Sequence, residues 1–239
     1  MTWSRRKPAV ITAVSLAVVL VAAGSLWNVS SARTFQFFGD LVHRVETGEK
    51  LVALTFDDGP DPAGTQHVLD VLEAEDVHAT FFLVGRDLEE HPDLGRKIAQ
   101  AGHEIGNHTY HHRRMVGVLP GTVAREVEDT DARIRRTGYS GDIHFRPPNG
   151  KKLFALPHYL QRHGRTTVMW DVEPDSEGVH TAGQIAERTL RETRPGSIVL
   201  LHPMYPAREQ TRQALKPIIA GLKERGYRFV TVSALLDRR

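Results

Sequence analysis

Short apolar runs alternate with longer amphipathic stretches along most of this 239-residue chain. The apolar runs have the length and composition of buried strands, and seven of them occur, at 51–56, 78–84, 103–106, 142–146, 166–171, 197–201 and 227–232. Between these runs apolar residues recur every three or four positions, as in helices, over 64–76, 86–101, 121–137, 152–163, 181–194 and 207–225. Strands that alternate with helices throughout a chain are parallel strands joined by crossovers, which predicts an α/β barrel or a doubly wound sheet.

The N-terminal residues carry a different pattern. An uncharged, mostly apolar run covers 8–27, which is about the ~20 residues that a membrane-spanning helix needs. The basic segment 5–7 precedes it, which predicts a cytoplasmic N-terminus and export of everything after residue 27. Small residues at 30–32 would suit a signal peptidase. We expect an uncleaved anchor in the cell membrane, with the alternative of a secreted protein if the signal is cleaved.

These patterns divide the chain into four segments. We expect a cytoplasmic basic stub at 1–7, a transmembrane or signal segment at 8–27, a tether at 28–48 and a single α/β domain at 49–239. Phe35, Phe37 and Phe38 of the tether are expected to pack on that domain, and the protein is expected to be a monomer.

Charge and composition exclude several functions. The 31 basic residues nearly balance the 29 acidic ones and are spread along the chain, so nucleic acid is not an expected partner. The absence of cysteine excludes thiolate chemistry and disulfides. Thirteen histidines are many for this length, which makes a metal or proton-transfer site worth locating.

The first strand of the domain ends in two carboxylates, Asp57 and Asp58, before Gly59 and Pro60 stop regular structure. Neighbouring carboxylates repel each other, and this cost is tolerable when one binds a cation and the other pairs with a proton or an arginine. An isolated Asp-Asp-Gly sequence is more often a solvated turn. Other segments must therefore decide between a turn and a site.

Polar residues follow the ends of four further strands. In folds of this kind ligands bind at the carboxyl ends of the strands, so such residues are candidates for one site. They are Asn107, His108, His111 and His112 after the third strand, Arg146 and Asn149 after the fourth, Asp171, Glu173 and Asp175 around the end of the fifth, and His202 after the sixth. Carboxylates, imidazoles and an arginine from five separate segments predict a functional site at this end of the strands.

The histidines suggest a metal. His108 and His112 are four residues apart, so on a helical turn both imidazoles would face the same way and could share a cation. Two histidines and one carboxylate suit Zn²⁺, with Co²⁺ or Ni²⁺ as alternatives, and leave a coordination position for water. His111 competes with His112, and spacing does not choose between them.

Arg146 and His202 each have a structural and a functional interpretation. Arg146 could form a surface ion pair, or its fork of donors could keep one carboxylate ionised and oriented. His202 follows a buried apolar strand, where a lone histidine is often structural, but its place on the rim of the other candidates favours chemistry.

The segments TFDDGP, HTYHH, RPPNG, WDVEPDS and LLHPM resemble, in order and separation, the five motifs of the polysaccharide deacetylases of NodB-homology type, carbohydrate esterase family 4. The resemblance extends from about Val52 to the C-terminus. It implies a distorted (β/α)7 barrel and a metal-dependent hydrolase that removes acetyl groups from N-acetylated sugars in polymers such as peptidoglycan or chitin oligomers. In this interpretation 49–239 is the catalytic domain.

The resemblance also implies roles for single residues. It makes Asp57 the general base and Asp58 a metal ligand, with His108 and His112 as the ligating histidines. Arg146 corresponds to the arginine that tethers the base.

The remaining motifs imply the acid and the substrate pocket. His202 corresponds to the general acid and Leu200 lines the acetyl pocket. The carboxylate that partners the acid is expected at Glu173 or its neighbour Asp171.

Two motifs depart from the family pattern. Pro148 and Asn149 are expected to contact substrate, but the family usually has Tyr or Phe where Asn149 stands, so only its backbone amide is expected to serve the oxyanion. Ser176 and Glu177 replace an Asp-Trp pair. Two alternatives follow: a membrane-anchored carbohydrate-binding protein with impaired catalysis, or an esterase that acts on O-acetylated xylan.

Overall fold

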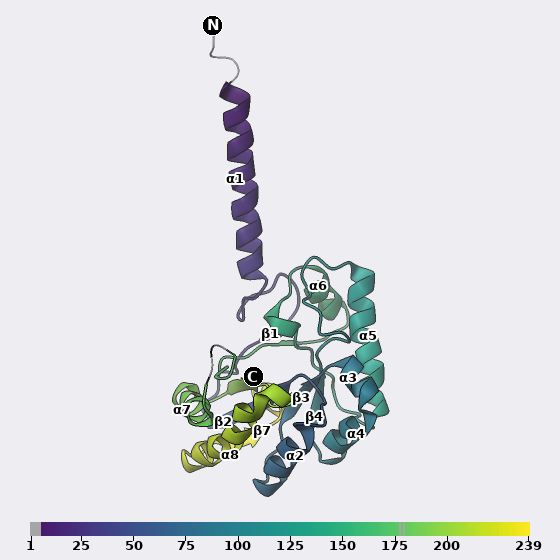
Figure 1. Ribbon diagram of the computed structural model, residues 1–239, viewed down its shortest axis with the longest axis vertical. Coiled ribbons are helices and arrows are strands. Elements are labelled where there is room, and N and C mark those ends of the chain that lie inside the picture. The colour runs from purple at the N-terminus through teal and green to yellow at the C-terminus, as the bar shows by residue number, and fades with distance from the viewer. Residues whose placement is uncertain (1–5, 177, 179) are drawn as a thin grey trace.

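A computed structural model describes residues 6–176, 178 and 180–239. Helix α1 (Arg6–Val29) projects away from the rest of the chain, on the side that carries β1 and α6 (Figure 1). Its segment Val10–Val29 has a mean hydropathy of 2.2 and is exposed, and by length and composition it could cross a membrane. Most of the predicted basic stub, including Arg5, lies outside the described residues.

The rest of the chain is built on short parallel strands. They are β1 (Leu41–Val42), β2 (Leu51–Asp57), β3 (Thr80–Leu83), β4 (Glu104–Asn107), β5 (Thr167–Val168), β6 (Ser197–Leu201) and β7 (Arg228–Val230). Five of them form a sheet in the order β4-β3-β2-β6, with β7 paired to the first half of β2. The other two, β1 and β5, pair with each other.

Single bridges close this sheet into a barrel. Phe145 pairs with Asn107 at the end of β4 and with Thr167 of β5, and Val172 pairs with Val199 of β6. The distorted α/β barrel expected from the sequence is therefore confirmed. The fourth predicted strand, 142–146, is reduced to the bridges at Phe145, because the two prolines that follow have no N–H to donate to a ladder.

Helices surround the barrel. They are α2 (Thr65–Ala74), α3 (Gly85–Glu90), α4 (Pro92–Gln100), α5 (Pro120–Arg136), α6 (Ala155–Arg162), α7 (Ala182–Glu192), α8 (Glu209–Glu224) and the short α9 (Val232–Leu236), with 3₁₀ turns at Pro148–Gly150 and Pro206–Arg208. The predicted helix 86–101 is two helices. Pro92 lacks an N–H group and starts a new helix, as proline commonly does at a first helical position.

Residues along β2 alternate between two apolar layers. Val52, Leu54 and Phe56 pack against the helices. Leu51 and Ala53 belong to the layer inside the barrel, with Phe82, Trp170 and Leu200. Because side chains alternate along a strand, the same face continues through Thr55 to Asp57. The first aspartate of the pair therefore enters the barrel.

Part of the predicted tether belongs to the packed domain. Leu41 and Val42 form β1, and Val42 and Val45 are buried in the inner apolar layer. Ser30 is also buried. The segment 28–48 is thus held against the barrel over much of its length, and β1 is a strand that the sequence pattern did not predict.

Candidate active site

A cavity of about 520 Å³ lies at the carboxyl ends of the strands. Eight of the residues predicted from the sequence line it: Asp57, Asp58, His108, His112, Asn149, Glu173, Leu200 and His202. The other predicted residues do not line it: Asn107, His111, Arg146, Pro148, Asp171 and Asp175. The topology thus gathers the candidates at the end of the barrel where parallel α/β folds bind their ligands.

Arg146 pairs with Asp57 inside the barrel. Its Nη1 donates to Asp57 Oδ1 at 2.7 Å and to Thr55 Oγ1 at 2.8 Å, and its side chain is fully buried. The guanidinium lies 4.1 Å from the ring centroid of Phe82. Burial lowers the pKa of Arg146, although the charge of Asp57 opposes this shift. A buried guanidinium next to a buried carboxylate provides a partner for its charge and fixes its orientation.

Asp58 turns away from this pair toward two histidines. Its backbone has a φ of 75°, in the left-handed region that residues other than glycine rarely adopt. Asp58 Oδ1 lies 3.3 Å from His112 Nε2 and 3.9 Å from His108 Nε2. One ligand atom from each of the three residues lies within 4.8 Å of the others, and among the described residues no other such group of histidine and carboxylate ligands occurs.

The environment of His108 determines which of its two nitrogens carries the proton. His108 Nδ1 lies 2.8 Å from the carbonyl oxygen of Arg146, and because a carbonyl only accepts, Nδ1 is the protonated nitrogen. Burial lowers the pKa of His108, with Asp57 opposing, so the ring stays neutral and Nε2 carries a lone pair. A ligand histidine held by a carbonyl in this way is typical of protein metal sites.

The segment 108–112 is a loop, so the prediction of a helical turn is wrong. Thr109 and His112 both have positive φ angles. The side chain of Asn107 accepts from the Thr109 N–H, and the carboxylate of Glu126 accepts from the N–H groups of the two residues before His112. These side chains replace the hydrogen bonds of a helix and produce the same juxtaposition of His108 and His112.

His111 is not part of the cluster. Its Nδ1 lies 2.9 Å from Glu126 Oε1, on the outer side of the loop. The geometry therefore favours His112 over His111 beside Asp58.

The partner of His202 is Asp175. His202 Nδ1 lies 3.1 Å from Asp175 Oδ1, and the His202 N–H donates to Asp175 Oδ2 at 2.8 Å. Thr211 donates to the same carboxylate. Burial opposes the charged imidazole, but the hydrogen bond and charge of Asp175, with Asp57 and Asp58 nearby, raise the pKa of His202 to about 9. His202 is therefore protonated at neutral pH, with Nε2 as its second nitrogen.

The predicted partners of His202, Glu173 and Asp171, bind elsewhere. Asp171 accepts from Ser197 Oγ and from the Ile198 N–H at the start of β6. Glu173 accepts from Trp170 Nε1 at 2.7 Å and pairs with an arginine.

The register of the parallel chains could have identified Asp175. The Asp171 carboxylate accepts from the Ile198 N–H. The two segments run parallel in constant register, so the residues four positions further along, Asp175 and His202, also lie side by side. Glu173 was predicted from its position in the family motif, whereas the register of the two segments pairs Asp175 with His202. Glu177 of the same motif lies outside the described residues.

Asn149 and Leu200 form another wall of the cavity, and Pro148 does not reach it. Asn149 has a φ of 54° and its Oδ1 accepts from Arg114 Nε at 3.0 Å. Pro148 is buried beneath it, and Leu200 contributes an apolar patch to the cavity. These residues leave a mixed surface beside the carboxylates.

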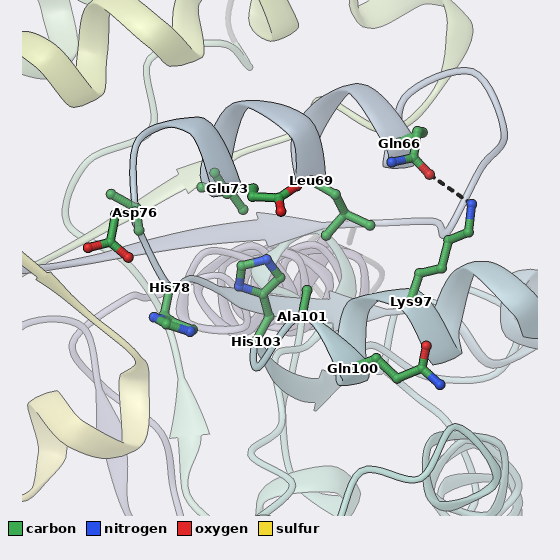
Figure 2. Close-up of a pocket in the computed structure, with 11 residues that line it drawn as sticks. Gln66, Leu69, Glu73, Asp76, His78, Lys97, Gln100, Ala101 and His103 are labelled. Carbon is green, nitrogen blue, oxygen red and sulfur yellow. Dashed lines mark hydrogen bonds between the residues drawn. The ribbon is translucent and has the colours of Figure 1, made fainter.

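A second hollow, of about 550 Å³, lies between α2 and α4. Figure 2 shows Glu73 and Leu69 of α2 on one side and Lys97 and Gln100 of α4 on the other, with Lys97 Nζ donating to Gln66 Oε1 at 2.8 Å. It lies where His78 and His103 precede β3 and β4, at the amino ends of the strands. Its position makes it a poorer candidate for chemistry.

Comparison with known proteins identifies the family. The sequence model of the polysaccharide deacetylase family matches residues 44–168. A peptidoglycan-N-acetylglucosamine deacetylase of Bacillus cereus is 36% identical over 200 residues, which cover 83% of this chain and 93% of the relative.

Solved structures agree. A peptidoglycan N-acetylglucosamine deacetylase has a TM-score of 0.78 and 34% identity, covering 82% of this chain and 92% of its own. A family 4 acetyl xylan esterase from Clostridium thermocellum, in complex with a cobalt ion, has a TM-score of 0.72 and 37% identity. The match covers 79% of this chain and 91% of the esterase chain. The chain belongs to the polysaccharide deacetylase family of hydrolases.

Proposed function

We propose that this protein is a metal-dependent deacetylase that hydrolyses the N-acetyl amide of N-acetylglucosamine-type residues in a cell-wall polysaccharide or a chitin-like oligomer. The observation that carries the proposal is the different pairing of two adjacent aspartates. Asp57 binds a buried arginine, whereas Asp58 faces two histidines. A protonated His202 completes the set. The names of the relatives support the same class of substrate.

Asp58, His108 and His112 would hold the metal. Two imidazole nitrogens and one carboxylate oxygen suit Zn²⁺, and Co²⁺ or Ni²⁺ also accept such ligands. A bound divalent ion lowers the pKa of water and stabilises negative charge on an amide oxygen.

Asp57 and His202 perform the proton transfers. Asp57, held in place by Arg146, accepts a proton from the attacking water. His202 donates a proton to the nitrogen as the carbon–nitrogen bond breaks, because an amine leaves only when it is protonated. Asp175 holds the acid in its charged form. The products are acetate and a free amino sugar.

The walls orient the acetyl group. Leu200 offers an apolar surface for the methyl group, and the backbone amide of Asn149 offers a hydrogen bond to the developing oxyanion. Helix α1 would keep the enzyme in the cell membrane with the barrel outside the cytoplasm.

Washed membranes from cells that express the full chain should release acetate from N-acetylglucosamine oligomers or peptidoglycan. A chelator should abolish the release and added Zn²⁺ or Co²⁺ should restore it, because the three proposed ligands have no role without a metal. Activity in the soluble fraction would contradict anchoring. Acetate release from acetylated xylan alone would favour the esterase alternative.

Substitution of the two aspartates should impair different properties of the enzyme. Asp57→Asn keeps the proposed ligands and should retain bound metal while losing kcat by about 10²-fold or more, the scale of general-base removal. Asp58→Asn should lose the metal itself. Metal content by mass spectrometry, measured beside acetate release, compares them. Wild-type turnover in Asp57→Asn would refute the assignment of the base.

The dependence of kcat on pH should report the protonation state of His202. Since this imidazole must be protonated to act as the acid and its pKa is raised to about 9, kcat should fall as the pH rises through that value. Asp175→Asn removes the charge that raises the pKa, so this alkaline fall should move to lower pH by about one unit or more. Asp171→Asn should leave it in place. Equal shifts in both variants would show that Asp175 is not the specific partner.

A further inference from the structure

The end of α1 and the residues after it are hydrogen-bonded to Lys151 and Lys152, in the loop that follows Asn149; we call this set of contacts the clamp. Lys152, which is 1% exposed, donates from Nζ to the carbonyl oxygen of Ala32 at 2.6 Å, and its N–H donates to that of Ser30 at 2.8 Å. Lys151 Nζ donates to the carbonyl oxygen of Trp27 and lies 3.9 Å from the centroid of its ring. The start of the predicted tether therefore has a fixed position beside the active-site loop.

This clamp brings the segment to the catalytic cavity. Ser31 and Arg33 line the same cavity as the paired aspartates. Arg33 Nη2 donates to Glu173 Oε2 at 2.6 Å, and its guanidinium lies 4.9 Å from the ring centroid of Trp170. Trp170 Nε1 donates to the same oxygen of Glu173. Three side chains from two distant parts of the chain thus form one polar and aromatic set at the cavity wall.

The chemistry of this set fits a sugar. A carboxylate accepts from hydroxyls and a guanidinium donates to them. Trp170, which is 5% exposed and belongs to the inner apolar layer, supports the guanidinium. The side chain of Arg33 is 42% exposed, and its hydrogen bond to Glu173 uses one of five N–H donors. None of the three residues pairs with the proposed metal ligands or with His202. A cavity of about 520 Å³ is also larger than an acetamide group requires.

We propose that Ser31 and Arg33 form a wall of the substrate cleft and that Arg33, supported by Glu173 and Trp170, positions a sugar unit adjacent to the one that is deacetylated. This inference rests on the proposed function for the identity of the polymer. It makes Arg33 a positioning residue that acts on binding and not on the chemical step. It also assigns a role to Glu173 that differs from the predicted pairing with His202.

Binding and turnover of an N-acetylglucosamine pentamer, measured on the full chain in detergent micelles, test the inference separately. Arg33→Ala should raise the Kd from calorimetry, and the KM, by about tenfold, because charge-assisted hydrogen bonds to the sugar are lost. The kcat should change less than twofold. Hydrolysis of 4-nitrophenyl acetate, which has no sugar, should be unaffected. Arg33→Lys should be intermediate, since it keeps the charge without the fork.

Arg96→Ala is the matched control, because Arg96 is 46% exposed, pairs with Asp93 and lies on α4 away from the cavity. It should bind the pentamer as wild type does. An unchanged Kd in Arg33→Ala, or equal losses on the pentamer and the small ester, would overturn the inference. A weaker Kd in Arg33→Ala in a protein that releases no acetate would support the inference and refute the proposed function.

Discussion

The buried ion pair between Arg146 and Asp57 is the interaction on which the site depends. A guanidinium without solvent contact is stable only if its charge and its donors are satisfied, and here Asp57, Thr55 and the carbonyl oxygens of Val168 and Met169 satisfy them. Removing one partner of such a pair typically costs about 3–5 kcal/mol, because the other charge stays buried. The pair joins β2 to the segment around β5 across the barrel.

The same ion pair gives the adjacent carboxylates of Asp57 and Asp58 different surroundings. Strand alternation places Asp57 inside the barrel, where Arg146 takes up its charge. Asp58 follows the last residue of the strand, and its left-handed backbone turns it to the histidines. His108 Nε2 lies near both carboxylates, 3.6 Å from Asp57 Oδ2 and 3.9 Å from Asp58 Oδ1, but only Asp57 pairs with Arg146 and Asp58 is the one beside His112. This difference in partners would allow one carboxylate to serve as base and the other as ligand.

The sequence predicted what depends on local periodicity. The alternation of apolar runs and amphipathic stretches predicted a parallel α/β fold and its strand ends, and so the cavity that contains Asp58, His108 and His202, whereas the family resemblance implied the barrel. The sequence pattern did not predict features that depend on contacts between residues far apart in the chain. The loop at 108–112 is shaped by Glu126 from α5, and the partner of His202 is set by the register of two chains far apart in sequence.

The N-terminal segment shows the same limit. Its composition is that of a linker, and contacts with residues more than a hundred positions away, among them Lys151, Lys152 and the β5 strand, fix it. Arg33 is the fourth residue after Val29, the end of α1, and four residues span at most ~14 Å. The wall of the cleft is therefore close to the end of the proposed anchor, which would direct the enzyme to glycan near the membrane surface.

The division between the two aspartates can be seen directly by locating the metal. Anomalous diffraction at the zinc absorption edge, from crystals of the zinc-loaded protein, should give one peak at ~2.0–2.2 Å from a carboxylate oxygen of Asp58 and from one nitrogen each of His108 and His112. Asp57 should remain bonded to Arg146. A peak bonded to Asp57, or an Asp57 side chain that has left Arg146 for the metal, would contradict the account.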